Sequence, residues 1–321
     1  MEKHTSIHTA IREKRGLEVP RDATVIDIRE YLKERKNLID HALERYLKEC
    51  KHQPQTLYRA MQYGLFPGGK RFRPILTVAC GELFGGKHKS LLPFACALEL
   101  IHTYSIIHDD LPALDDDDLR RGEPATHKVF GEGIALLAGD ALLTEAFHLM
   151  TGPQVARLLG PALILQLVHE IARAAGIVGM VGGQVVDLEA EGREVDIATV
   201  DYIHVRKTGA LIHTAARVGA RIGGALPKEL RRISRYAEFL GLAFQVTDDI
   251  LDAVGLPATT GQTEAKDREK GKATYPSVVG LAAARGRAQE LLHHCLKELQ
   301  VFGKDADPLR GIAYYVAQRV Q

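Results

Sequence analysis

The chain has 321 residues, of which 45% are hydrophobic and 26% are charged. This is the mix of a soluble globular protein, long enough to bury a large core as one big domain or two ordinary ones. The formal net charge is only +1, so no overall field favours nucleic acid or an anionic membrane, and function has to come from local clusters.

The N-terminus and the cysteines indicate the compartment. The first residues are charged and lack the apolar segment of a secretory signal. Charges interrupt every apolar stretch before it reaches the length of a membrane span. Cys50, Cys80, Cys96 and Cys295 are widely spaced, without a CxxC pair. We therefore expect a cytoplasmic protein with no membrane span.

Helical periodicity dominates the chain. The segment from Val25 to Glu49 places apolar residues at helical spacing among Lys, Arg and Glu, and the segment from Lys228 to Asp252 repeats the pattern. Few alternating segments are flanked by hairpin turns, so we expect strands to be scarce. Glycine and proline breaks divide the chain into ten or more helices, without a low-complexity linker. The prediction is one all-α domain over residues 25–321, preceded by a loosely ordered extension, residues 1–24.

A basic motif follows the next predicted helix. The segment LYRAMQYGLF (residues 57–66) is amphipathic, and GGKRFRP (residues 68–74) then places Lys70, Arg71 and Arg73 after a flexible glycine pair. Arginine suits bidentate phosphate binding, and lysine acts as a point charge. Gly64, Gly69 and Lys70 also fit most of a nucleotide-binding P-loop. Arg71 replaces the Ser or Thr that such a loop needs for Mg²⁺, however, and a helix precedes it instead of a strand, so we reject that assignment.

Six carboxylates then fall within ten positions, in HDDLPALDDDD. The apolar run ALELIHTYSII (residues 97–107) predicts a helix that ends near Pro112. Asp109 and Asp110 close its last turn, and Asp115 follows just after the break. Carboxylates at a helix C-terminus oppose the helix dipole, so this arrangement costs stability unless a cation binds. The alternative is a solvated acidic loop.

Further cations follow at helix boundaries. Arg120 and Arg121 come directly after the aspartates, and RKTG (residues 206–209) supplies Lys207 and Thr208. One basic pair is usually a matter of solubility. Three basic groups next to apolar sequence, including GGKRFRP, indicate ligands for phosphate groups.

A second acidic cluster lies in FQVTDDILD (residues 244–252). On a helix its oxygen-bearing side chains share one face, and no Lys or Arg occurs in residues 236–265 to pair with them. Salt-bridging acids are the alternative to a metal site. Two carboxylate clusters at the ends of apolar helices favour Mg²⁺, which takes few protein carboxylates and fills its other positions with water and phosphate oxygens. The residues at this spacing are Gln245, Asp248, Asp249 and Asp252.

Taken in chain order, the basic motif, the two aspartate clusters and the segments between them resemble the trans-isoprenyl diphosphate synthase (polyprenyl synthetase) family, from about Val25 to Gln321. The chain looks most like bacterial farnesyl diphosphate synthases (geranyltranstransferases), whose first Asp motif also carries two extra residues. Plant and bacterial geranylgeranyl diphosphate synthases share that insertion and are the close alternative. The resemblance implies an all-α bundle of the isoprenoid synthase type, a deep central cavity between the Asp motifs, and a homodimer. The matching segments are GGKRFRP, ELIHTYSIIHDDLPALDDDDLRRG, THKVFGEGIALLAGDALL, KTGALI, FQVTDDILD and GKATYP.

The resemblance also implies the reaction. An allylic diphosphate (dimethylallyl or geranyl) ionises to a carbocation, the double bond of isopentenyl diphosphate attacks it, and a proton leaves. Pyrophosphate is released, and farnesyl diphosphate is the expected product. Charge stabilisation by Mg²⁺, as three ions with substrate bound, would help the pyrophosphate to leave.

Each role falls on positions that match the family's motifs. The expected metal ligands are Asp109, Asp110, Asp115, Asp248, Asp249 and Asp252. The expected ligands of isopentenyl diphosphate are Lys70, Arg73, His102 and Arg121. The expected ligands of the allylic diphosphate are Arg120, Lys207, Thr208, Gln245, Lys266 and Lys272. The catalytic group is expected to be Asp109, Asp248, Lys207, Thr208 and Gln245. Tyr104, with the small Ser105 beside it, is expected to close the cavity and set product length.

The chain departs from the family's pattern at one position, and two other functions have to be weighed against a prenyl diphosphate synthase. After the second Asp motif the family usually has Gly-Lys, whereas this chain has Gly261-Gln262, and we expect Lys266 to offset the missing charge. A non-catalytic subunit of a heteromeric prenyl synthase typically loses its acidic motifs, and this chain keeps both. A terpene cyclase needs no isopentenyl pocket, which GGKRFRP and Arg121 argue against.

Overall fold

The computed structural model describes residues 26–49, 54–67, 69–255 and 274–319, so the predicted extension lies outside the described residues. Within these ranges the chain is almost entirely helical, which confirms the predicted fold class. The strands that it forms there are two residues long each, β1 (Leu119–Arg120) and β2 (Glu123–Pro124), paired as an antiparallel hairpin. The long helices are α2 (Ile28–Glu49), α4 (Phe72–Leu83), α5 (His88–Asp109), α7 (Glu132–Thr151), α9 (Pro161–Ala175), α12 (Ala210–Gly223), α13 (Pro227–Ala253), α16 (Leu281–Glu298) and α17 (Asp307–Gln318). The shorter ones are α3 (Gln55–Leu65), α6 (Thr126–Phe130), α8 (Pro153–Leu159), α10 (Met180–Ala190), α11 (Ile197–Ile203), the π-helical turn η1 (His204–Gly209), α15 (Tyr275–Val279) and the 3₁₀ turn η2 (Lys304–Ala306).

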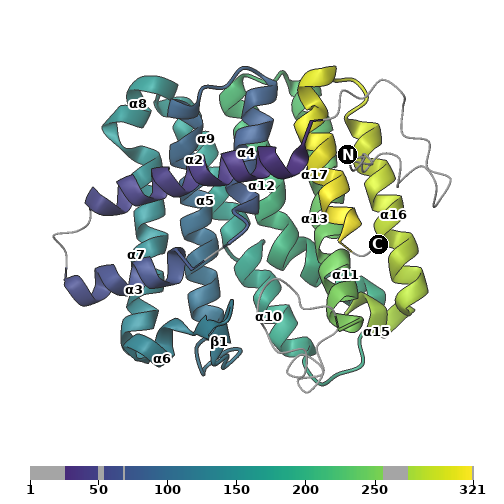
Figure 1. Ribbon diagram of the computed structural model, residues 1–321, viewed down its shortest axis with the longest axis horizontal. Coiled ribbons are helices and arrows are strands. Elements are labelled where there is room, and N and C mark those ends of the chain that lie inside the picture. The colour runs from purple at the N-terminus through teal and green to yellow at the C-terminus, as the bar shows by residue number, and fades with distance from the viewer. Residues whose placement is uncertain (1–25, 50–53, 68, 256–273, 320–321) are drawn as a thin grey trace, which may run out of the picture.

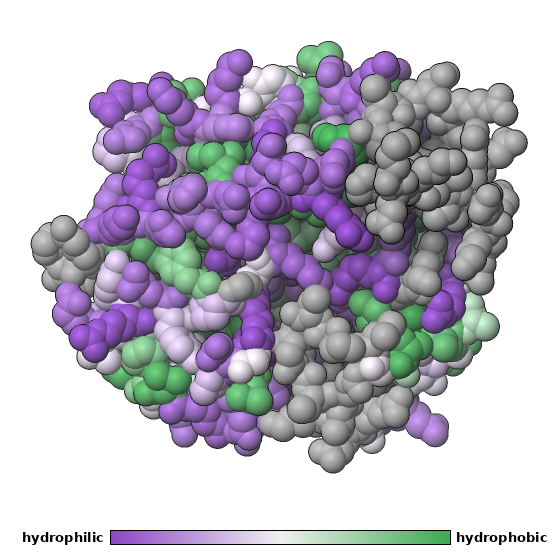
Figure 2. All heavy atoms as spheres, viewed as in Figure 1, coloured by the Kyte–Doolittle hydropathy of each residue, from purple (hydrophilic) through white to green (hydrophobic). Residues whose placement is uncertain are grey.

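The bundle is built around α5. Its residues from Leu91 to Ile101 are all buried, as expected for a helix that is apolar on every side. It packs on α4 and α7, α4 packs on α12, and α12 packs on α13. Figure 1 shows α2 lying across these helices, and the face in view in Figure 2 is largely hydrophilic. The amphipathic pattern of α2 follows from this position, because one face covers the bundle and the other meets water.

The functional motifs lie where helices end. Helix α5 stops at Asp109, and the β1–β2 hairpin follows it. Figure 1 shows this hairpin, α10 and α15 at one end of the bundle. The turn η1 contacts both α10 and α13, and α15 contacts α13. Both Asp-bearing helices therefore place their polar residues next to short elements.

Three described segments are long and apolar enough to cross a membrane, judged by length and composition alone. They are His88–Asp109, Glu132–Thr151 and Pro161–Ala190, and their most apolar stretches are 78%, 33% and 39% buried inside the protein. Burial in the bundle interior accounts for the apolar character of the first segment. The absence of a membrane span stays a prediction.

Candidate active site

The acidic loop after α5 is folded back against the end of that helix. The backbone N–H of Asp115 donates to the carbonyl of Asp109 at 2.8 Å, and that of Asp117 donates to the carbonyl of Asp110 at 3.2 Å. Asp110, Asp115 and Asp117 are 2%, 5% and 6% exposed, whereas Asp116 is exposed. A freely solvated acidic loop is therefore excluded for the three buried aspartates.

Asp110 binds an arginine of the same loop. Arg120 Nε donates to Asp110 Oδ1 at 2.8 Å, and a second guanidinium nitrogen contacts the same oxygen. Arg120 also lies 3.4 Å from Asp117 Oδ2. In this structure the Asp110 carboxylate anchors Arg120, one of the predicted diphosphate ligands, and its metal role stays a prediction.

Asp109 carries a carboxylate that lacks sufficient countercharge. Burial raises its pKa to about 6; Lys207 lowers the pKa and the neighbouring Asp115 raises it again. Burial also raises the pKa of Asp110, against the opposing effect of Arg120. A cation added at this helix end would lower the pKa of Asp109 and favour its ionised form.

In the second cluster, the structure corrects the expectation that these acids have no basic partner. Arg319, just after α17, lies 2.5 Å from Asp248 Oδ1. Burial raises the pKa of Asp248, while Arg319 and Lys70 both lower it. The partner comes from 71 residues away, so the absence of Lys and Arg in residues 236–265 does not describe the environment of Asp248.

Asp249 is held inside the protein by three neighbours and is 4% exposed. Its Oδ1 accepts from Gln245 Nε2 at 3.1 Å, and its Oδ2 accepts from the backbone N–H of Tyr275 at 2.8 Å. His204 Nε2 lies 3.2 Å from the same Oδ2. Asp249 thus joins α13, η1 and α15. Asp252, one turn further along, is half-buried.

The predicted catalytic residues Lys207 and Thr208 lie in the π-helical turn η1, a type of turn that occurs frequently at functional sites. The ammonium of Lys207 lies 2.6 Å from Asp187 Oδ2, and the hydroxyl of Thr208 donates to Gln245 Oε1 at 2.9 Å. Helix α10 packs so closely against η1 that a Cβ added to Gly183 would lie 2.3 Å from the backbone nitrogen of Lys207. The predicted carbocation-facing groups, Thr208 and Gln245, are in direct contact.

Three of the four predicted isopentenyl diphosphate ligands, Lys70, Arg73 and Arg121, form a cationic cluster, and the charges of Arg73 and Arg121 act on the fourth, His102. Burial lowers the pKa of Lys70 to about 8, with Arg319 and Arg121 lowering it further and Asp248 raising it. Burial also lowers the pKa of Arg73 to about 10. The pKa of His102 falls well below its usual value, through burial and then the charges of Arg73 and Arg121. An anion bound beside these residues would offset the cost of burying their charges together.

Arg71 does not join this cluster, although it lies in the same motif. Its side chain is 1% exposed and is bound by Asp40 and Glu99, each at 2.8 Å. The grouping of Arg71 with Lys70 and Arg73 as phosphate ligands is therefore wrong. The predicted Lys266 and Lys272, and Gln262, lie outside the described residues.

Tyr104, the predicted determinant of product length, is a buried residue of α5. It is 7% exposed, and its ring meets the imidazole of His108 edge-on with 5.6 Å between ring centroids. The hydroxyl of Ser105 donates to the carbonyl of His102 at 2.9 Å and so stays within its own helix.

The donor set suits a hard cation. Among the described residues, no group of three or more His, Cys, Asp or Glu side chains could hold a metal ion. Asp109 and Asp248 offer carboxylate oxygens near two helix ends, and the burial that raises the pKa of Asp109 favours an added cation. Mg²⁺ is usually bound by one or two carboxylates together with substrate phosphates, so these residues fit it.

The sequence alone did not point to several residues of the site. Arg319 belongs to none of the motifs, and only the folding of the chain brings it to Asp248. Asp187 and Gln184 lie in the segment GGQVVDL. Its glycine pair within an apolar helix could have predicted that another part of the chain packs closely there. Both amide atoms of Gln184 are buried without a hydrogen-bond partner in the described part of the chain. Glu99, an acid in an apolar run, could likewise have predicted a buried basic partner.

Comparison with known proteins identifies the family. The family model described as Polyprenyl synthetase matches residues 54–307. The chain belongs to the polyprenyl synthetase family. This polyprenyl synthetase is 45% identical to the farnesyl diphosphate synthase of Escherichia coli (strain K12) over 284 residues, which cover 87% of the chain and 95% of that relative. It is 41% identical to the geranylgeranyl diphosphate synthase of Cyanophora paradoxa over 290 residues, 90% of the chain and 95% of that relative.

The solved structures agree. A crystal structure of geranyltransferase from Legionella pneumophila superimposes with a TM-score of 0.82 at 31% identity, and the match covers 91% of this chain and 97% of that one. The isoprenoid synthase fold and the trans-prenyl synthase family are thereby confirmed.

Proposed function

We propose that this polyprenyl synthetase is a farnesyl diphosphate synthase, which condenses isopentenyl diphosphate head-to-tail with dimethylallyl and geranyl diphosphate and releases pyrophosphate. The observation that carries the proposal is the pairing of two chemically different sites for diphosphate groups. One is rich in carboxylates at the ends of α5 and α13, and the other is the cationic cluster around Lys70 and Arg73. A reaction that ionises one diphosphate and spares the other requires this difference.

The allylic diphosphate belongs at the carboxylate-rich site. Asp109 and Asp248 would hold Mg²⁺ there, and the ion would supply charge that stabilises the pyrophosphate leaving group. Arg120, fixed by Asp110, and Lys207 add protein cations next to the oxygens of that group. These groups act mainly when negative charge develops on the leaving oxygen, so they lower the barrier to ionisation.

The carbocation left behind meets the polar groups of η1 and α13. Thr208 donates to Gln245 Oε1, which orients that amide oxygen, while Gln245 Nε2 donates to Asp249. A fixed amide dipole stabilises nearby positive charge without having to reorganise. Asp249 thereby acts on the reaction through the orientation of Gln245.

Isopentenyl diphosphate belongs at the cationic cluster. Lys70, Arg73 and Arg121 supply charge, while burial and the charges of the neighbouring arginines lower the pKa of His102 well below its usual value and so favour its neutral form. Arg73 Nε is buried without a hydrogen-bond partner in the described structure, so a donor is available to a diphosphate oxygen. Binding by protein cations alone keeps this diphosphate intact while its double bond attacks.

The length of the product is assigned to Tyr104. A tail anchored at Asp109 extends along α5, and the buried Tyr104 ring lies five residues back, roughly 7–8 Å along the axis. We propose that this ring, braced by His108, closes the cavity at fifteen carbons. The curated relatives include farnesyl and geranylgeranyl synthases at similar identity, so the twenty-carbon product is the second candidate.

Incubation with isopentenyl diphosphate, geranyl diphosphate and Mg²⁺, followed by chromatography of the dephosphorylated products, tests the proposal. We expect farnesol as the main species. Geranylgeraniol as the main species would overturn the assigned chain length, and no condensation by the folded protein would overturn the activity.

A homodimer is proposed from exposed leucines on three neighbouring helices. Leu137 on α7, Leu158 on α8 and Leu165 on α9 are 54%, 50% and 73% exposed, on helices that contact one another. Apolar surface of this kind marks interaction sites in soluble proteins. Light scattering after gel filtration distinguishes a dimer from a monomer, and a monomer at micromolar concentration would contradict the proposal.

The cytoplasm remains our proposed location. Cys80, Cys96 and Cys295 are buried free thiols, the state that a reducing compartment maintains. Immunodetection in fractionated cells tests it, and recovery from the membrane pellet or the medium would contradict it.

A further inference from the structure

Arg71 has an unusual place in its motif. It is 2% exposed and directly precedes α4, between Lys70 and Arg73, yet its guanidinium is directed to Asp40 and Glu99. Each of its three guanidinium nitrogens already donates a hydrogen bond. The acceptors are Asp40 Oδ1 at 2.8 Å, Glu99 Oε1 at 2.8 Å and the carbonyl of Leu65 at 2.7 Å. A guanidinium satisfied in this way is a structural anchor and not a substrate ligand.

The backbone of Arg71 is as unusual as its side chain. Its φ of 50° is in the left-handed region, which residues with a Cβ rarely occupy. Its carbonyl accepts from the N–H of Ile75 and so starts α4. This conformation sets the angle between the loop that carries Lys70 and the first turn of α4, which carries Arg73. The buried side-chain anchor holds the strained backbone in place.

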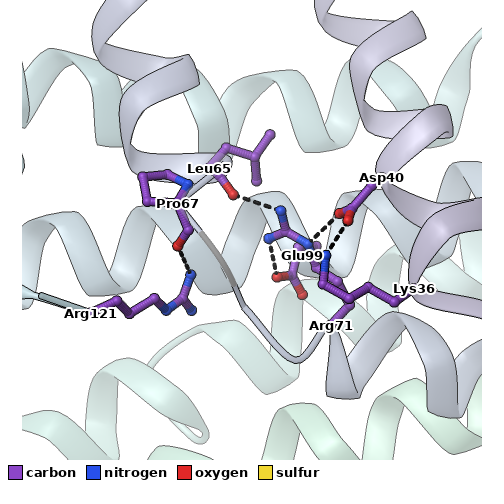
Figure 3. A network of polar contacts seen from close by, with 7 residues as sticks. All are labelled: Lys36, Asp40, Leu65, Pro67, Arg71, Glu99 and Arg121. Atoms are coloured by element: carbon purple, nitrogen blue, oxygen red, sulfur yellow. Dashed lines mark hydrogen bonds and ion pairs between the residues drawn. The ribbon is translucent and has the colours of Figure 1, made fainter. Parts of the chain in front are cut away.

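The loop is held from a second side by Arg121. One of its guanidinium nitrogens donates to the carbonyl of Pro67 at 3.1 Å. The guanidinium also lies so close to Gly69 that a Cβ there would be 3.0 Å from it. Figure 3 shows the carbonyls of Leu65 and Pro67 directed to these two arginines. Arg121 belongs to the predicted substrate pocket, whereas Arg71 holds the loop from inside the protein.

Glu99 supplies negative charge to the buried arginines around this loop. It is 2% exposed, and only one of its oxygens has a hydrogen-bond partner in the described structure, namely Arg71. Its charge also raises the pKa of Arg73 and Arg121 against the lowering caused by burial. Glu99 is therefore a shared countercharge for three arginines and lies one helical turn before His102.

We propose that Asp40, Arg71 and Glu99 form a positioning triad for the metal-free diphosphate pocket. The triad touches no substrate; it fixes the direction of Lys70 and Arg73 and so sets the affinity for isopentenyl diphosphate without affecting the allylic site. This inference rests on the proposed function, because it takes the cationic cluster as the isopentenyl site.

The test uses Arg71→Lys, which keeps the positive charge and removes the three-way fork. Because a small misplacement of positioned groups is costly, we expect the KM for isopentenyl diphosphate to rise about 10-fold. The KM for geranyl diphosphate should change less than about 2-fold. The matched control is Arg217→Lys, which breaks the partly buried Arg217–Glu170 pair between α12 and α9. The control should leave both KM values unchanged.

A purely structural role gives a different result. It lowers the melting temperature and the active fraction while leaving both KM values unchanged, or it raises both equally, and either outcome would overturn the triad. If Arg71→Lys does not fold, Asp40→Asn replaces it. The Asp40 carboxylate is 21% exposed, and the loss of its charge should raise only the isopentenyl KM, by about 3-fold.

A binding measurement separates this inference from the proposed function. Isothermal titration of isopentenyl diphosphate into wild type and Arg71→Lys, with EDTA present, reports the pocket without turnover. Wild type that binds but does not condense the substrates would refute the proposed function and leave the triad to be judged by the variant. Equal dissociation constants for the two proteins would refute the triad.

Discussion

The titration of Lys70 gives a quantitative test of the isopentenyl pocket. Burial and the charges of Arg319 and Arg121 bring its pKa from 10.5 to about 8, against the opposing effect of Asp248. A group with that pKa is about 90% charged at pH 7 and about 10% charged at pH 9. The charged form is the one that binds diphosphate, so affinity is lost as the pH rises through 8. Because kcat/KM reports the free enzyme, its value for isopentenyl diphosphate should fall about 10-fold between pH 7 and pH 9.

The assay is steady-state turnover at saturating geranyl diphosphate across this pH range. Lys70→Arg is the control, because a guanidinium stays charged throughout, and its profile should be nearly flat. The same decline in Lys70→Arg as in wild type would assign it to another group. A flat wild-type profile would show that Lys70 does not contribute its charge to binding, which would refute the reasoning.

Three further substitutions test the other parts of the site. Asp109→Asn should lower kcat by about 10²-fold or more with unchanged circular dichroism, since it removes charge stabilisation realised at ionisation; a near-normal rate would contradict the metal assignment. Gly183→Ala brings a Cβ to 2.3 Å from the backbone nitrogen of Lys207, so η1 has to shift. We expect kcat to fall at least 10-fold, and an unchanged kcat would show that the geometry of η1 is not critical. Tyr104→Ala should move the product toward twenty or more carbons at similar turnover, and an unchanged product would place the cavity floor elsewhere.

Local patterns predicted the fold and the ends of its main helices well. The periodicity of residues 228–252 predicted α13, which runs from Pro227 to Ala253, and the aspartates after residues 97–107 were placed where α5 ends, at Asp109. These features depend on hydrophobic spacing and on residues that end helices, both of which act over a few residues.

Pairing between distant residues was not predictable in this way. Arg319 reaches Asp248 from the far end of the chain, and Arg71 is turned inward by Asp40 and Glu99 on two other helices. In both cases the partner is set by tertiary packing, which leaves no mark in the local sequence. Arg71 shows the consequence: within one motif, identical residue types serve different purposes.

The central claim is that the two diphosphates are held by different chemistry, one with metal and one without. The most direct measurement is isothermal titration of isopentenyl diphosphate and of a thio-bridged geranyl diphosphate that cannot ionise, each with Mg²⁺ and with EDTA. The account predicts that the geranyl analogue loses its affinity in EDTA, while isopentenyl diphosphate binds with a similar dissociation constant in both conditions. Equal metal dependence of the two ligands, whether both require Mg²⁺ or neither does, would contradict it.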